Sequence, residues 1–216
     1  MKYKWILPLF LLSVVACGGK KSKKAADNAG VETAQRADEA IILGNQGLDL
    51  LTNYSENTDS LKKSVLLFEK AIKIDKKNEL TYYNLAKAWF KLGKDAEALN
   101  ALDQVIAVNP NRPDPYVHKG ALFDILGREK EAIASYDKGL SLLKEALMNG
   151  HGEALLNELG ICFVYYMSKE SDKYELEIKK LTYKYKDDPV SLDYVKGLDE
   201  QLQTTTPKAT ASAIYE

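Results

Sequence analysis

Residues 79–112, ELTYYNLAKAWFKLGKDAEALNALDQVIAVNPNR, are followed at once by residues 113–146, PDPYVHKGALFDILGREKEAIASYDKGLSLLKEA. Each stretch has 34 residues, and aligning one with the other pairs identical or similar residues. The pairs are Tyr82 and Tyr116, Trp89 and Phe123, Leu92 and Leu126, Gly93 and Gly127, Glu97 and Glu131, Ala98 and Ala132, and Asp103 and Asp137. A fixed period of this size is typical of stacked repeat proteins. The duplication therefore predicts repeated helix pairs.

The paired residue types have physical reasons. Gly93 and Gly127 are expected to end the first helix of each pair, because glycine adopts a left-handed conformation at little cost. Ala98 and Ala132 are small enough to let the two helices of a pair approach closely. Pro110 marks the boundary between the two stretches, since proline cannot continue a helix.

The order of these residues resembles the tetratricopeptide repeat, whose pattern is W-x2-L-G-x2-Y, then A-x3-F, then P. The resemblance covers about residues 38–203 and implies an all-α, TPR-type α-solenoid of antiparallel helix pairs with a C-terminal capping helix. About four units are expected within a TPR-like helical domain at 36–203, the central ones at 79–112 and 113–146. The second central unit departs from the pattern at Lys119 and Lys144, where an apolar residue and a proline are expected.

The outer units are expected to be distorted by insertions. The first unit would place its helices at Asp38–Leu51 and Leu61–Asp75, with Asn53–Asp59 as a long polar loop. The fourth would follow an inserted turn at Met148–Gly152 and place its second helix at Ser171–Lys186. Val190–Leu202 has apolar residues at helical spacing and is expected to be the capping helix. Residues 204–216 form a polar stretch without periodicity, for which disorder is predicted.

Composition excludes some functions. The chain has 216 residues and a net charge of -1, which argues against a general nucleic-acid-binding protein because such proteins present a strongly basic face. Two cysteines cannot build a disulfide framework.

The first residues have the layout of a secretory signal peptide: a basic start, then a mostly apolar run from Trp5 to Ala16. The run ends in Val14-Val15-Ala16-Cys17, which resembles the bacterial lipobox. That resemblance implies a signal peptide at 1–16 and a mature chain whose Cys17 carries a diacylglyceryl thioether and an acylated (palmitate-type) amino group. A plain signal peptide with an incidental cysteine and a buried apolar N-terminal helix are the alternatives.

Residues 17–35 contain four lysines and almost no large apolar residue, which predicts a flexible tether after the lipidated cysteine. Gly18 rather than Asp follows Cys17. In the proteobacterial sorting scheme this implies the outer membrane rather than the inner membrane, with the periplasmic or surface side left open.

Candidates for catalysis are few. His118 and His151 are not at metal-ligand spacing, and Cys162 lies at a helix position that normally packs inward. The sequence contains no Gly-rich phosphate loop, no His-Glu-x-x-His and no Gly-x-Ser-x-Gly. We therefore expect no catalytic residues, no metal and no cofactor.

The resemblance implies a concave groove lined by the first helix of each unit, where a protein or peptide partner would bind. The expected groove residues are Tyr83, Asn84, Lys87, Lys91, Val117, His118, Ala121, Asp124, Asn157 and Tyr165. Asn84 and Lys87 are similar to the family's carboxylate clamp, but the next unit has Asp114 and His118 where a second clamp would need partners. The groove is mixed aromatic and polar and suits an extended peptide or a partner helix.

These observations predict a lipid-anchored, non-catalytic adaptor or scaffold in the bacterial envelope. A ligand-binding lipoprotein that works with a transporter is the alternative, and an envelope enzyme is the third. The fold alone does not choose among them.

Overall fold

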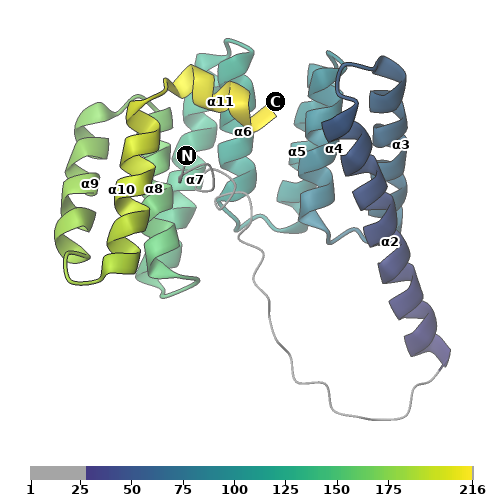
Figure 1. Ribbon diagram of the computed structural model, residues 1–216, viewed down its shortest axis with the longest axis horizontal. Helices are drawn as coiled ribbons and strands as arrows, with labels where there is room; N and C mark the ends of the chain where they lie inside the picture. The colour runs from purple at the N-terminus through teal and green to yellow at the C-terminus, as the bar shows by residue number, and fades with distance from the viewer. Residues whose placement is uncertain (1–27, 216) are drawn as a thin grey trace. The chain divides into compact units, whose positions relative to one another are not determined.

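The computed structural model describes the backbone of residues 28–215 and the side chains from residue 35 onward. Within those residues the chain forms ten α-helices and no strand, which confirms the predicted all-α class (Figure 1). The helices are α2 (Asn28–Asn53), α3 (Thr58–Ile74), α4 (Glu79–Lys91), α5 (Asp95–Val108), α6 (Asp114–Ile125), α7 (Glu129–Met148), α8 (Ala154–Met167), α9 (Ser171–Lys184), α10 (Pro189–Gln203) and α11 (Pro207–Tyr215). The expected signal peptide at 1–16 and Cys17 lie outside the described residues.

The chain divides into two compact units at Pro110 and Asn111. The N-terminal unit contains α2 to α5, in which α2 packs on α3, α3 on α4 and α4 on α5. Its core is made of apolar side chains that repeat along one face of each helix. These include Leu61, Val65, Phe68, Tyr82, Leu85, Ala86, Ala98, Leu102 and Val105. α2 and α3 approach each other closely at Gly47, where an added Cβ would lie 2.7 Å from Cε1 of Phe68.

The C-terminal unit contains α6 to α11. Its helix pairs are α6 with α7 and α8 with α9, and α7 also packs on α8. α10 packs on α9 and α8, as expected of a capping helix. α11 packs on α6 and α8, which are the first helices of successive pairs (Figure 1).

The predicted glycine turns are confirmed. Gly93 has φ of 69° and Gly127 has φ of 70°, both in the left-handed region. The next residue in each turn donates its backbone N–H back into the helix. Lys94 N–H reaches the Trp89 carbonyl at 2.9 Å, and Arg128 N–H reaches the Phe123 carbonyl at 2.8 Å. These bonds satisfy carbonyls that would otherwise lack a partner at the helix end.

Two boundaries differ from expectation. The helix predicted to start at Asp38 starts at Asn28, so α2 takes in the last part of the segment predicted to be a flexible tether at 17–35. The disorder predicted at 204–216 is corrected by α11. Thr210, Ala211, Ile214 and Tyr215 of α11 are buried. Packing therefore supplies the stability that the sequence pattern of this short polar stretch did not indicate.

Candidate functional site

The expected groove residues of the N-terminal unit all lie on α4. Tyr83, Asn84, Lys87 and Lys91 are half-buried, and residues three or four apart on a helix share a face. Burial and the neighbouring Lys91 ammonium group lower the pKa of Lys87. This face of α4 therefore offers an aromatic ring, an amide and two positive charges, which suits a ligand that carries carboxylates or carbonyls.

In the C-terminal unit the corresponding surface on α6 is covered by the chain itself. His118 is 6% exposed and Ala121, one helical turn later, is 0% exposed. The Tyr215 hydroxyl of α11 donates a hydrogen bond to the His118 carbonyl oxygen at 2.9 Å. The two rings meet edge to face with centroids 6.5 Å apart. The segment predicted to be disordered thus lies on residues predicted to bind a partner.

Two other expected groove residues on α6 hold the α6–α7 pair together. Asp124 Oδ2 accepts a hydrogen bond from the Tyr136 hydroxyl at 2.9 Å. Val117 Cγ2 would lie 3.0 Å from a Cβ added at Gly139. Both contacts are between the two helices of one repeat.

The two expected groove residues on α8 also have partners inside the unit. Asn157 Nδ2 donates to the His151 carbonyl oxygen at 2.8 Å and so ties α8 to the preceding loop. The buried Tyr165 ring has the Lys144 and Lys173 ammonium groups 5.2 and 5.6 Å from its centroid. Tyr165 therefore packs towards α7 and α9.

The side chains considered for catalysis, Cys162 and His151, lie in different surroundings: one is buried and the other is exposed. Cys162 is fully buried, and burial together with Glu177 and Glu158 raises the pKa of its thiol to about 12. A thiol with that pKa is almost entirely protonated at neutral pH and is a poor nucleophile. His151 is exposed in the loop between α7 and α8. Among the described residues, no group of three His, Cys, Asp or Glu side chains could hold a metal ion.

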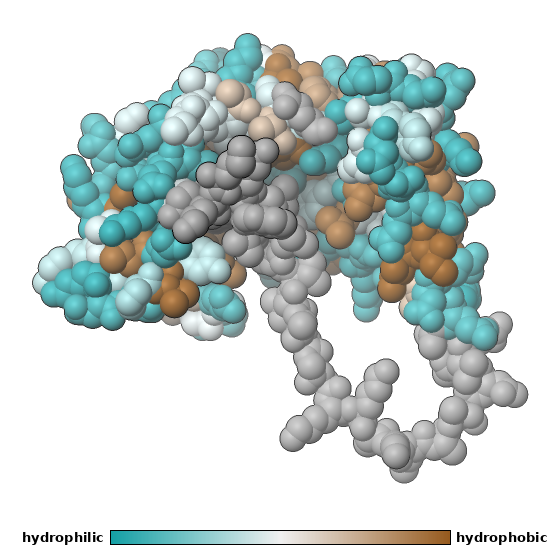
Figure 2. Space-filling view, in the orientation of Figure 1, coloured by the Kyte–Doolittle hydropathy of each residue, from teal (hydrophilic) through white to brown (hydrophobic). Residues whose placement is uncertain are grey.

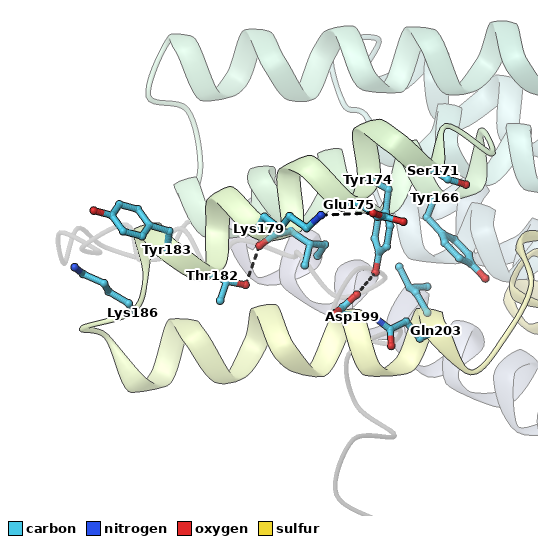
Figure 3. A pocket seen from close by; sticks show the side chains of 12 residues that line it. Tyr166, Ser171, Tyr174, Glu175, Lys179, Thr182, Tyr183, Lys186, Asp199 and Gln203 are labelled. Atoms are coloured by element: carbon cyan, nitrogen blue, oxygen red, sulfur yellow. Dashed lines mark hydrogen bonds and ion pairs between the residues drawn. The ribbon is translucent and has the colours of Figure 1, made fainter.

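A groove between α9 and α10 was not predicted from the sequence. It has a volume of about 930 Å³. Figure 3 shows Tyr183 and Lys186 at one end and Tyr166 and Ser171 at the other. Ile178 and Leu202 supply its apolar lining. It was missed because the spacing of apolar residues in α10 does not indicate how far that helix lies from α9.

A hydrogen bond joins the two helices across this groove, and an ion pair lies along one of them. The Tyr174 hydroxyl on α9 donates to Asp199 Oδ1 on α10 at 2.8 Å (Figure 3). Burial, and then the hydrogen bond to Asp199, raise the pKa of Tyr174 above its ordinary value. The phenol therefore stays protonated and acts as a hydrogen-bond donor. Lys179 and Glu175 form an ion pair at 3.6 Å along α9.

No helix in the described part of the chain is long and apolar enough to cross a membrane.

Comparison with known proteins identifies the repeats directly. Tetratricopeptide repeat family models match residues 61–121 and 113–142. Tetratricopeptide repeat protein 28 of Homo sapiens is 28% identical over 78 residues, which are 36% of this chain and 3% of that protein. The mouse protein of the same name matches with the same identity and coverage. The chain therefore spans about 3% of the length of these curated relatives.

Two solved structures align with parts of the chain. The crystal structure of MamA has a TM-score of 0.43 and 21% identity, and the match covers 74% of this chain and 97% of MamA. The first TPR domain of the human RPAP3 protein has a TM-score of 0.42 and 24% identity, covering 49% of this chain and 80% of that domain. Residues 61–142, less than half of the chain, are therefore similar to tetratricopeptide repeats, a fold that suggests a protein-binding adaptor or scaffold.

Proposed function

We propose that this protein is a membrane-anchored, non-catalytic lipoprotein of the bacterial cell envelope that acts as an adaptor or scaffold. The observation that carries the binding role is the half-buried face of α4 formed by Tyr83, Asn84, Lys87 and Lys91. This face lies inside the stretch matched by the repeat family. First helices of such repeats line the concave surface on which repeat proteins bind their partners.

The charges on α4 favour an acidic, extended peptide. Lys87 and Lys91 are one helical turn apart, and like charges at this spacing destabilise a helix by about 0.2–0.5 kcal/mol. A carboxylate placed between the two ammonium groups removes that repulsion and forms charge-assisted hydrogen bonds. Asn84 supplies amide donors and an acceptor for a peptide backbone.

Apolar surface accompanies these charges in the same unit. Ile41 and Ile42 on α2 are 53% and 56% exposed. Figure 2 shows hydrophobic side chains among hydrophilic ones on the visible face of this unit, where α2 runs. These two neighbouring isoleucines are apolar surface that a partner would remove from water. The expected partner is therefore a protein segment that combines carboxylates with apolar side chains.

A co-purification experiment tests the adaptor role. Chemical crosslinking in intact cells, detergent extraction and mass spectrometry identify the proteins held by the unaltered chain. The double substitution Tyr83→Ala with Lys87→Ala is expected to remove at least one of them. The matched control is Leu66→Ala with Lys70→Ala, which has the same spacing on the exposed side of α3. Equal recovery of every protein by both double variants would refute the α4 site.

The proposed anchor rests on the lipobox-like Val14-Val15-Ala16-Cys17. A single acyl chain gives only marginal membrane binding, whereas several chains give durable attachment. Cys17→Ala is expected to move the protein from the membrane fraction to the soluble fraction. Cys162→Ala is the control, because it removes the buried cysteine and leaves the anchor intact. Continued sedimentation of Cys17→Ala with membranes would show that another feature attaches the chain.

The groove between α9 and α10 favours a second candidate function, that of a ligand-binding lipoprotein working with a transporter. Its volume of about 930 Å³ lies in the range of small-molecule sites. A bound ligand is expected to raise the Tm of the unaltered chain. Asp199→Asn is the informative variant, because it removes the charge beside Tyr174 and keeps the shape. A screen in which no small molecule raises Tm would count against this role.

A further inference from the structure

α11 behaves as a ligand that the chain supplies for its own repeat surface. It packs on α6 and α8, the first helices of successive pairs within the C-terminal unit (Figure 1). These are the helices expected to line a partner-binding groove. We name the surface of α6 and α8 that α11 covers the α6/α8 groove.

The sequence of α11 is that of a docking helix. Within PKATASAIY, the buried side chains are Thr210, Ala211, Ile214 and Tyr215, spaced three and four residues apart along one face. Lys208, Ala209 and Ala213 are exposed. Helices shorter than about 12–15 residues are only marginally stable alone in water. The nine residues of α11 therefore depend on the α6/α8 groove for their helical state.

Hydrogen bonds link α11 and the connection before it to α6 and α8, beside the buried face formed by Thr210, Ala211, Ile214 and Tyr215. At one end the Tyr215 hydroxyl donates to the His118 carbonyl oxygen at 2.9 Å. Before the other end, the Tyr166 hydroxyl of α8 donates to the Thr205 carbonyl oxygen at 2.8 Å. Thr204, Thr205 and Thr206 form a short polar connection from α10. A helix of only nine residues that is joined to α10 by so short a polar connection can open locally without unfolding the helix pairs beneath it.

We propose that the α6/α8 groove is a second, helix-binding site and that α11 is its exchangeable internal occupant. The partner is an amphipathic helix that presents a small residue, a branched apolar residue and a tyrosine at the spacing of Ala211, Ile214 and Tyr215. This inference rests on the proposed adaptor role and specifies a site and a class of partner for it. Helices that bind in grooves are recognised through anchors at such spacings.

The occupant sets the conditions for binding. A partner helix must compete with α11, so its apparent affinity falls by the fraction of molecules in which the groove is open. A weak or dilute helix is therefore excluded, while a helix held at high local concentration can enter. α11 thus selects partners that are brought close to the chain.

The test uses the full chain in detergent and a fluorescein-labelled peptide with the sequence of residues 204–216. Ala211→Asp places a carboxylate on the buried face of α11, and Ala213→Asp places the same group on its exposed face. The peptide is expected to bind the Ala211→Asp chain at least about tenfold more tightly than the unaltered or Ala213→Asp chain. The same peptide carrying Ile214→Asp is expected to bind none of them.

Equal peptide affinity for all three chains would overturn the proposal, as would no binding to an Ala211→Asp chain that keeps its helicity. Hydrogen exchange on the unaltered chain provides the measurement that needs no variant. The amides of residues 207–215 are expected to exchange at least about tenfold faster than those of α7, because α11 opens locally. Equal exchange rates for both segments would show that α11 is a permanent part of the core and would overturn the proposal.

These experiments need no partner protein, so their results can be told apart from those of the co-purification experiment. Peptide binding without any protein captured at α4 would leave the α6/α8 groove standing and remove the proposed function. A protein captured at α4 together with failed peptide binding would support the proposed function and overturn the α6/α8 groove as a binding site.

Discussion

Single residues decide how closely the helices of a repeat approach each other. A Cβ added at Gly120 would lie 2.5 Å from Cε1 of the buried Tyr136 ring. The hydroxyl of Tyr136 is bonded to Asp124, so the ring has little freedom to move. Gly44 is different, since its added Cβ would lie 3.7 Å from Thr81 Oγ1, an ordinary contact distance.

Gly120→Ala is therefore expected to lower the free energy of unfolding by about 1–3 kcal/mol through overpacking. Gly44→Ala is the matched control and is expected to be neutral, or to stabilise by up to about 1 kcal/mol through helix propensity. Urea denaturation measures both. Gly120→Ala with unchanged stability would show that the α6–α7 contact is looser than described.

The buried phenol of Tyr136 predicts a loss of stability at alkaline pH. Burial, followed by the Asp124 charge and hydrogen bond, raises the pKa of Tyr136 above its ordinary value. Below pH about 10 the phenol is protonated in both states, and above it only the unfolded chain ionises. The unfolded state then binds fewer protons, so this group lowers stability as pH rises, by up to about 1.4 kcal/mol per pH unit.

Tyr136→Phe is expected to reduce the slope of unfolding free energy against pH above pH about 10. Tyr183→Phe, at a side chain that is 74% exposed, is the control and is expected to leave the slope as it is. Chemical denaturation at several pH values gives the slopes. Equal slopes for Tyr136→Phe and the unaltered chain would show that the Tyr136 phenol is not a source of the alkaline loss of stability.

At the scale of elements, the helix pairs follow from the period of the sequence. Ala98 and Ala132 were expected between paired helices, and they are 0% and 1% exposed. Ala132→Leu is expected to cost about 1–3 kcal/mol because it forces α6 and α7 apart. Ala134→Leu, on the exposed side of α7, is the control. A Tm for Ala132→Leu equal to that of the control would contradict the register.

Other elements could not be predicted from the same pattern. Thr210 is polar and Ala211 is small, so Ile214 and Tyr215 are the only large side chains of the buried face, and only tertiary packing makes their spacing meaningful. The sequence does carry one signal, in α8: residues 159–165 (LGICFVY) contain no charged residue. The structure buries all of them. A helix that is apolar all round needs neighbours on every side. α7, α9 and α10 pack on α8, and α11 adds a further neighbour.

The candidate site shows the same division between local and long-range information. The residues of the α4 face were expected from the resemblance to the repeat family, and they share one face because they are one or two turns apart on one helix. The covering of His118 was not, because Tyr215 lies 97 residues away in sequence. The groove between α9 and α10 likewise depends on the spacing of two helices, which no residue pattern specifies.

At the scale of the whole molecule, the two units differ in what lies on the first helices of their repeats. In the N-terminal unit, α4 carries a half-buried aromatic and basic face. In the C-terminal unit, α11 lies on α6 and α8. We propose that α4 binds one partner by default and that the α6/α8 groove admits a second only when α11 is displaced.

The most direct test of the adaptor role is site-specific photocrosslinking in intact cells of the source organism. A photoreactive phenylalanine analogue replaces Tyr83 in one chain and Leu66, which is 57% exposed on α3, in another. The expected result is a discrete crosslinked protein from position 83 that is absent from position 66 and lost when Lys87→Ala and Lys91→Ala are added. Identical crosslinking patterns from positions 83 and 66, or none from position 83, would contradict partner binding on α4.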